Sequence, residues 1–108
     1  MNDLLPVGSI VKIRFDQAKY CIIGFYTKDP VTGKVYDYTA VKYPFGIEDI
    51  DNLVGFESKR IKEVVQRGYE TEEDKSFRQE IYEEVKGKQG KAEFVSVSPV
   101  HPIEKLEE

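Results

Sequence analysis

The sequence predicts an α+β domain: a small, bent antiparallel β-sheet of four or five strands, SH3-like or half-barrel, packed by one C-terminal helix. Three observations favour this fold. Short β-forming runs separated by turn residues fill the first half of the chain. One amphipathic stretch with a capping pattern follows them. The length of 108 residues allows one core that needs no disulfide or metal.

The first predicted strand spans 7–15. Within it Val11, Ile13 and Phe15 alternate with basic residues, so these three side chains are expected on one buried face. The next four residues have the length of a hairpin connection. The first strand is therefore predicted to pair with the one that follows.

The second predicted strand spans 19–26 and is apolar on both faces. Simple alternation places Phe25 on the face of Cys21 and Ile23, opposite Tyr20. Two apolar faces are typical of a central strand that is covered on both sides. Gly24 interrupts the run and predicts a bulge or a sharp bend.

The third predicted strand spans 34–43, after a turn over residues 27–34. Alternation places Tyr36 and Tyr38 on one face, where they are expected to pack at the edge of the core. Tyr43 falls on the other face with Val35, Asp37, Thr39 and Val41, which is expected to be half-solvated.

After Pro44 the strand pattern ends. Residues 45–58 combine glycines, acidic residues and apolar residues without a clear period, which predicts a long, partly packed loop with one helical turn. A short helical turn at 58–61 is expected to lead into a fourth strand within 59–69. Gly68 predicts a bend at the end of that strand.

The predicted helix spans 71–87. Thr71 is a candidate N-cap with Asp74 three residues later, close to the capping-box pattern. A narrow apolar stripe on this helix consists of Phe77, Ile81, Tyr82 and Val85. We expect residues 1–87 to form one domain and residues 88–108 an extended arm or tail, with room for one short strand within 92–100.

The composition argues against several classes of protein. The net charge of −4 disfavours nucleic-acid binding, because phosphate contacts need a basic face. No apolar run approaches the roughly 18 residues typical of a membrane span. The first ten residues do not resemble a signal peptide, and the single cysteine, Cys21, permits no internal disulfide. A cytoplasmic protein with an inert, buried thiol is expected.

Residue types suited to catalysis or metal binding are scarce. The single histidine, His101, lies in the predicted tail, which disfavours a zinc site and a Ser-His-Asp or Cys-His arrangement. Glu48, Asp49 and Asp51 do not follow the spacing of an EF-hand loop. Residues 31–34 lack the glycine spacing of a P-loop. We therefore expect no cofactor, no metal and no catalytic residues.

The aromatic and acidic residues around Pro44 are the best candidates for a binding surface. Tyr43 and Phe45 lie beside a loop, as in many peptide-docking surfaces. The predicted partner-binding residues are Tyr43, Phe45 and Phe56 as apolar anchors, and Glu48, Asp49 and Asp51 as acidic residues that steer a basic partner.

Five motifs together resemble a family of small, uncharacterised bacterial proteins. The motifs are LLPVGS (4–9), IIG (22–24), YDY (36–38), YP with Gly46 (43–46), and VV with GY (64–69). The resemblance covers roughly residues 4–80. It departs at Phe45, where the family tends to carry an acidic residue, and at Phe25, where it tends to carry a polar one.

Members of that family are often encoded in type VII (ESX-like) secretion gene clusters of Gram-positive bacteria. The resemblance therefore implies an association with that system, and it brings no catalytic residues with it. The leading expectation is a non-enzymatic, cytoplasmic protein-binding accessory factor, which acts as an adaptor, chaperone or immunity-type partner for a type VII secretion substrate or component.

Two other interpretations stay open. One is an SH3-like nucleic-acid-binding module that uses Lys12, Arg14, Lys59, Arg60 and Lys62. The other is a small hydrolase that uses the acidic loop, with Asp49 or Asp51 as its carboxylate. Because SH3-like folds support many unrelated roles, the fold alone does not decide among these interpretations.

Overall fold

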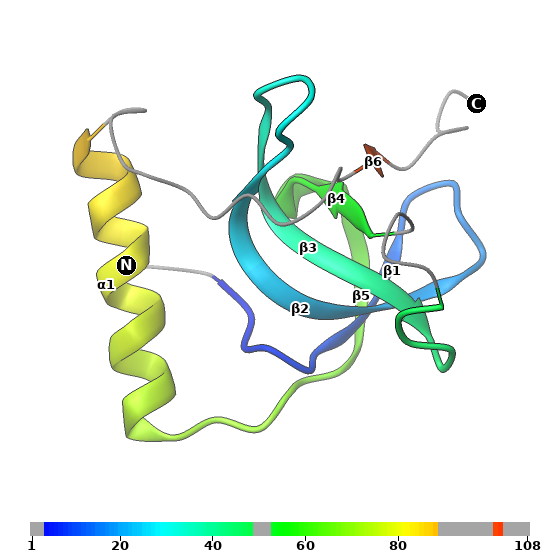
Figure 1. Ribbon diagram of the computed structural model, residues 1–108. Coiled ribbons are helices and arrows are strands. Elements are labelled where there is room, and N and C mark those ends of the chain that lie inside the picture. Colours follow the sequence, from blue (N-terminus) through cyan, green and yellow to red (C-terminus); the bar gives the residue numbers. More distant parts are fainter. Residues whose placement is uncertain (1–3, 49–52, 89–100, 103–108) are drawn as a thin grey trace.

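The computed structural model describes residues 4–48, 53–88 and 101–102, which form a β-sheet with one helix beside it (Figure 1). The strands are β1 (Ile10–Ile13), β2 (Lys19–Lys28), β3 (Val35–Tyr43), β4 (Val54–Phe56), β5 (Ile61–Gln66) and β6 (His101–Pro102). The helix α1 spans Glu72–Lys88. Strands β1 to β5 pair antiparallel, and β6 pairs parallel with β4. The predicted α+β class is confirmed.

The sheet is bent and open. Its strand order is β5-β1-β2-β3-β4-β6, and within the described part of the chain no pairing joins the two ends of this order. β2 and β3 form the longest pairing and curve strongly across the molecule (Figure 1). The second predicted strand is central, as expected, because β2 lies between β1 and β3. The sheet therefore has the form of a half-barrel.

Strand β4 was not predicted, because it lies inside the segment 45–58 that was expected to be a loop. It has three residues, and its central residue is Gly55. Its pairing with β3 joins Phe56 to Tyr38 and Val54 to Ala40. A strand this short has no readable period, so long-range pairing decides its conformation. The helical turn before the next strand is confirmed as the 3-10 helix η2 (Ser58–Arg60).

The bulge predicted at Gly24 is present and changes which face Phe25 occupies. Ile22 pairs with Ala40, whereas Gly24 pairs with Thr39, so β2 contains one extra residue at this point. The extra residue reverses the alternation of the side chains that follow. Phe25 therefore lies on the face of Ile22 and packs against the core, and its predicted place on the opposite face is wrong.

Phe15 is also placed differently from the prediction. β1 ends at Ile13, and the backbone amide of Asp16 donates a hydrogen bond to the Ile13 carbonyl at 3.2 Å. Phe15 lies inside this turn with a φ of 65°, and 69% of its surface is exposed. The turn interrupts the strand alternation, so Phe15 leaves the buried face that Val11 and Ile13 share.

The core lies between the concave side of the sheet and α1. Its buried residues are Leu4, Leu5, Val11, Ile13, Tyr20, Ile22, Tyr38, Ala40 and Phe56. Tyr36 and Tyr38 are buried, which confirms that they pack. Thr39 and Val41 on the other face of β3 are buried as well. The prediction of a half-solvated face is therefore wrong at these two positions. Strand alternation shows which side chains share a face, but it does not show whether another part of the protein covers that face.

Helix α1 begins as predicted. The Thr71 hydroxyl accepts a hydrogen bond from the Asp74 amide at 3.0 Å, which makes Thr71 the N-cap. Ile81 and Tyr82 pack against the core, and the ring of Phe77 lies 6.3 Å from that of Phe25. The strand predicted within 92–100 lies outside the described residues, and β6 follows that segment.

The segment Leu4–Ser9 precedes β1 and links the sheet to the stretch of chain that leads into α1. The Leu5 amide donates to the Tyr38 hydroxyl at 2.9 Å, and the Gly8 amide donates to the Ile22 carbonyl at 2.8 Å. Ser9 is fully buried, and its hydroxyl accepts a hydrogen bond from the Gly68 amide at 3.0 Å. This segment therefore contacts β2, β3 and the chain between β5 and α1.

Gly68 allows this close approach because it has no side chain. A Cβ atom at this position would lie 2.4 Å from the Val7 carbonyl oxygen and 3.0 Å from the Ser9 amide nitrogen. Both atoms are backbone and cannot rotate away. The constraint is steric, since Gly68 is not among the glycines with a positive φ.

We predict that Gly68→Ala lowers the free energy of unfolding by roughly 1–3 kcal/mol, the usual cost of forcing extra atoms into a packed site. Gly24→Ala is the matched control, because a Cβ there meets its nearest atoms at 3.7 Å and 3.9 Å. Urea denaturation followed by circular dichroism measures both variants. An equal loss of stability in the two variants would contradict the steric account.

Candidate functional site

Four large apolar side chains lie exposed at one end of the sheet, and we call them the loop-end cluster. Its members are Phe15, Tyr43, Phe45 and Ile47, with exposed fractions of 69%, 50%, 62% and 59%. Tyr43 at the end of β3 pairs with Lys19 at the start of β2. The β1–β2 turn that carries Phe15 therefore lies at the same edge as the end of β3 (Figure 1).

The chain after β3 holds Phe45 away from the core. The Tyr43–Pro44 peptide bond is cis, and Gly46 has a φ of 72°. The Gly46 amide donates a hydrogen bond to the Lys42 carbonyl at 3.0 Å, which closes the turn. Phe45 lies within this closed turn and therefore projects into solvent.

Two of the predicted anchors, Tyr43 and Phe45, thus lie on the surface beside each other. Glu48 is exposed as well, whereas Asp49 and Asp51 lie outside the described residues. Ile47 and Phe15 were missed as members of the cluster. The sequence does hint that Ile47 is exposed, since it is an isolated apolar residue between Gly46 and an acidic run. It gives no such hint for Phe15, which the pattern places at the end of an alternating strand.

Phe56 is not a surface anchor, and its predicted role in partner binding is corrected. Its side chain is 1% exposed, and its ring lies 5.7 Å from the Tyr38 ring and 6.5 Å from the Tyr20 ring. The pairing of β4 with β3 turns Phe56 into the core. Because that pairing was not predicted, the sequence pattern gave no reason to bury this ring.

The basic residues of the alternative interpretation gather at the β1–β5 edge. They lie on β1, just after it, in η2 and on β5, and the Arg14 amide donates to the Arg60 carbonyl at 3.1 Å. Lys12, however, pairs with Glu63 on β5. This acidic neighbour reduces the positive charge that a phosphate backbone would meet.

A cluster of charges around the buried Arg78 was missed by the sequence analysis. Arg78 is 4% exposed, and its guanidinium forms a two-point hydrogen bond with Asp74 at 2.7 Å and 3.0 Å. The same guanidinium lies 2.7 Å from Glu70 and also donates to the Leu4 carbonyl. Glu70 in turn receives two hydrogen bonds from Arg67.

This cluster is structural rather than reactive. A buried charge is tolerated when it is paired and fully hydrogen-bonded, and each acidic member here faces an arginine. The hydrogen bonds of Arg67 and Arg78 lower the pKa of Glu70 to about 2, and Asp74 raises the pKa of Arg78. Glu70 and Arg78 therefore stay charged near neutral pH.

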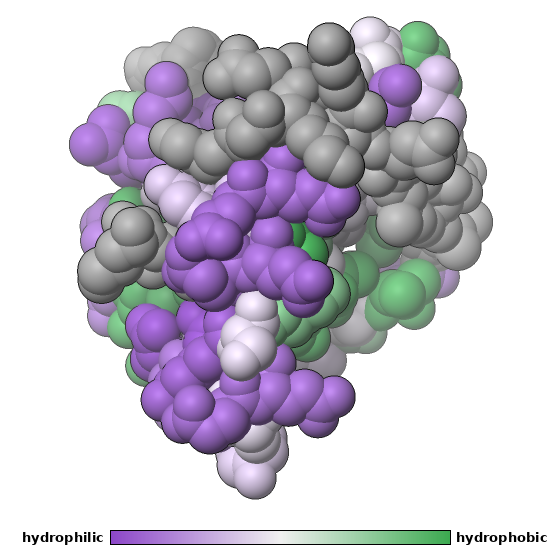
Figure 2. All heavy atoms as spheres, turned by 90° about the vertical axis from the view of Figure 1, so that its left-hand side faces the viewer, coloured by the Kyte–Doolittle hydropathy of each residue, from purple (hydrophilic) through white to green (hydrophobic). Residues whose placement is uncertain are grey.

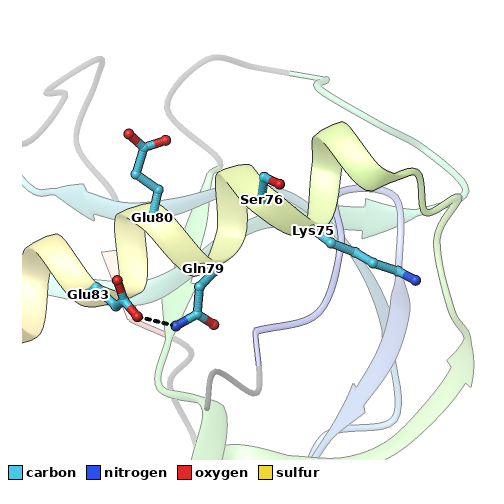
Figure 3. A pocket seen from close by; sticks show the side chains of 5 residues that line it. All are labelled: Lys75, Ser76, Gln79, Glu80 and Glu83. Carbon is cyan, nitrogen blue, oxygen red and sulfur yellow. Dashed lines mark hydrogen bonds between the residues drawn. The ribbon is translucent and has the colours of Figure 1, made fainter.

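The outward side of α1 is a solvated helix face. Figure 2 shows hydrophilic residues along this side of the molecule. Figure 3 shows Lys75, Ser76, Gln79, Glu80 and Glu83, which line a shallow depression and all come from α1. The Gln79 amide donates to the Glu83 carboxylate, a contact within the helix itself. Among the residues that the structure describes, only α1 lines this depression, so it is a poor candidate for a site.

Other kinds of site find little support in the described ranges. Within them, no group of three or more His, Cys, Asp or Glu side chains is placed to hold a metal ion. Burial raises the pKa of the Cys21 thiol, which is half-buried rather than buried as expected. No helix in this part of the chain is long and apolar enough to cross a membrane.

Comparison with known proteins places the chain in a family. A family model described as "Domain of unknown function (DUF4176)" matches residues 4–77, which is well over half of the chain. The chain belongs to this family, and the predicted resemblance to an uncharacterised family is confirmed in that respect. Neither the search of curated proteins nor that of solved structures found a match.

We predict that the Arg78 cluster makes stability depend on pH in the acid range. The pKa of Glu70 is below its ordinary value of 4.5, so its charged form stabilises the fold above about pH 4.5, and this contribution is lost as the pH falls toward 2. Glu70→Gln should therefore lose less stability than the wild type between pH 5 and pH 2, as measured by urea unfolding.

Glu72→Gln is the matched control for this pH series. The Glu72 side chain is 93% exposed and meets Lys75 at 3.9 Å, a weak surface pair. This variant should follow the wild-type pH profile. A wild-type profile in Glu70→Gln would contradict the role given to the cluster.

Proposed function

We propose that this protein is a non-enzymatic, cytoplasmic protein-binding accessory factor, and that the loop-end cluster is its docking surface. The observation that carries the proposal is the exposure of Phe15, Tyr43, Phe45 and Ile47 at the same end of the sheet. Exposed apolar side chains gathered at one end of a small domain are typical of a protein-interaction site. Two aromatic rings held by a closed turn suit the role of anchors, because little conformational entropy is lost when they bind.

The proposed partner presents apolar side chains together with a basic segment. Glu48, Asp49 and Asp51 follow the cluster directly in the chain, and the whole protein has a net charge of −4. Acidic residues next to an apolar patch accelerate encounter with a basic partner and fix its orientation. The motifs that resemble proteins of type VII secretion gene clusters support a more specific proposal. The partner is then a substrate or component of such a system, and the protein is its adaptor, chaperone or immunity-type partner.

We predict that Phe45→Ser abolishes binding to the partner and leaves the fold intact, since 62% of the Phe45 side chain is exposed. Loss of a central aromatic anchor costs about 2 kcal/mol or more, so the dissociation constant should rise about 30-fold or more. Partners would be sought by co-expression with each protein encoded in the same gene neighbourhood, and affinity would be measured by calorimetry on the purified pair.

Val31→Ser is the matched control, because Val31 is 76% exposed and lies in the β2–β3 turn at the opposite end of β3. It should bind like the wild type. Equal affinities of the two variants would remove the loop-end cluster as the docking surface. Failure of every protein of a type VII secretion cluster to bind would remove the link to secretion. RNA binding that weakens steeply with salt would instead support the nucleic-acid alternative.

A further inference from the structure

A second candidate site lies between the sheet and α1. It is a half-open cavity of about 320 Å³, at the lower end of the range for small-molecule pockets. Its polar lining consists of Tyr26, Asp37, Tyr38, Ser58 and Tyr82, and two aliphatic side chains, Leu4 and Val85, complete it. Asp37 and Tyr43 are both on β3 and lie six residues apart, about 20 Å. The cavity is therefore separate from the loop-end cluster.

Among the described residues of this lining, Asp37 is the one with a formally charged side chain. Its Oδ2 atom accepts hydrogen bonds from the Ser58 amide at 2.8 Å and the Ser58 hydroxyl at 3.2 Å, which fixes the carboxylate between β3 and η2. Its Oδ1 atom has no hydrogen-bond partner, and the carboxylate no ion-pair partner, among the described side chains. A half-buried carboxylate without a counter-ion attracts a cation.

Three tyrosines, Tyr26, Tyr38 and Tyr82, line the cavity together with this carboxylate. Burial, followed by the nearby Asp37, raises the pKa of Tyr26 to about 12, so its hydroxyl stays protonated at neutral pH. The Tyr38 hydroxyl already accepts a hydrogen bond from the Leu5 amide.

We propose that this cavity binds an alkylammonium group, the chemistry shared by a lysine side chain and a small primary amine. The ammonium pairs with Asp37 Oδ1 and donates to phenol oxygens, while its alkyl chain contacts Leu4 and Val85. An ammonium has three donors and no acceptor, which suits one free carboxylate oxygen among hydroxyls.

A guanidinium fits this cavity less well than an ammonium does. Guanidinium groups bind carboxylates best through two parallel hydrogen bonds, which need both oxygens. At Asp37 one oxygen is already occupied by Ser58. The geometry therefore favours a point charge that needs a single oxygen.

The test is a titration of the full chain, labelled with ¹⁵N, with n-butylammonium chloride and separately with n-butanol. We expect saturable shifts at the lining residues with the ammonium and none with butanol at the same concentrations. Asp37→Asn keeps an acceptor for Ser58 and should weaken ammonium binding at least tenfold. Glu80→Gln, on the outward side of α1, is the matched control and should bind like the wild type.

Tyr26→Phe keeps the ring, removes one hydroxyl, and keeps the proposal testable if Asp37→Asn fails to fold. It should weaken binding by about 2- to 10-fold, the usual value of one hydrogen bond. Equal responses to butylammonium and butanol would overturn the proposal. So would wild-type affinity in Asp37→Asn or in Tyr26→Phe.

Two further ligands identify the source of the ammonium group. Tighter binding of a lysine-containing peptide than of butylammonium, lost when the lysine is Nε-acetylated, would assign the cavity to a protein side chain. Binding of the free amine without the peptide would assign it to a small molecule. Because the Phe45→Ser variant leaves this cavity untouched, failure at one site is distinguishable from failure at the other.

Discussion

The segment Leu4–Ser9 is the element on which the rest of the structure depends. It has no regular secondary structure, yet Leu4, Leu5 and Ser9 are buried. Its backbone is bound by the Tyr38 hydroxyl, by β2 and by Arg78 on α1. Arg78 is buried and charged, so each N–H group of its guanidinium needs a hydrogen-bond acceptor. The Leu4 carbonyl is one of these acceptors. Sheet and helix are thus held together through a third element that belongs to neither.

This arrangement explains what the family motifs share. The LLPVGS motif is this segment, the IIG motif holds the β2 bulge, the YDY motif supplies Tyr38, and the GY motif begins with the sterically required Gly68. These motifs thus mainly maintain the architecture. Function is proposed for side chains that face solvent or line a cavity, and some of these also belong to the motifs. The loop-end cluster, with Phe45, lies beyond the end of β3, and the cavity lined by Tyr26 and Asp37 lies between the sheet and α1.

Much of the fold could be predicted from local patterns, and most of the exceptions depend on contacts between distant parts of the chain. The Thr71 cap, the Gly24 bulge and the packing of Tyr36 and Tyr38 depend on neighbours in the chain, and all three predictions are confirmed. The burial of Phe56, the face of Phe25 and the charges around Arg78 were missed. The burial of Phe56 against Tyr38 and the contact of Arg78 with Leu4 depend on partners far away in the sequence. Surface clusters formed by two loops, such as Phe15 with Phe45, are missed for the same reason. The face of Phe25 depends instead on the exact position of the bulge at Gly24, which the sequence does not fix.

Native-state amide hydrogen exchange tests the central claim most directly. If the segment Leu4–Ser9 is part of the cooperative framework, the amides of Leu5, Gly8 and Gly68 should exchange through global unfolding. Their free energies of exchange should then equal those of the β2 and β3 amides and the value from denaturant unfolding. Rapid exchange at Leu5 and Gly8 while β2 and β3 stay protected would contradict the account. It would show that the sheet holds together without this segment.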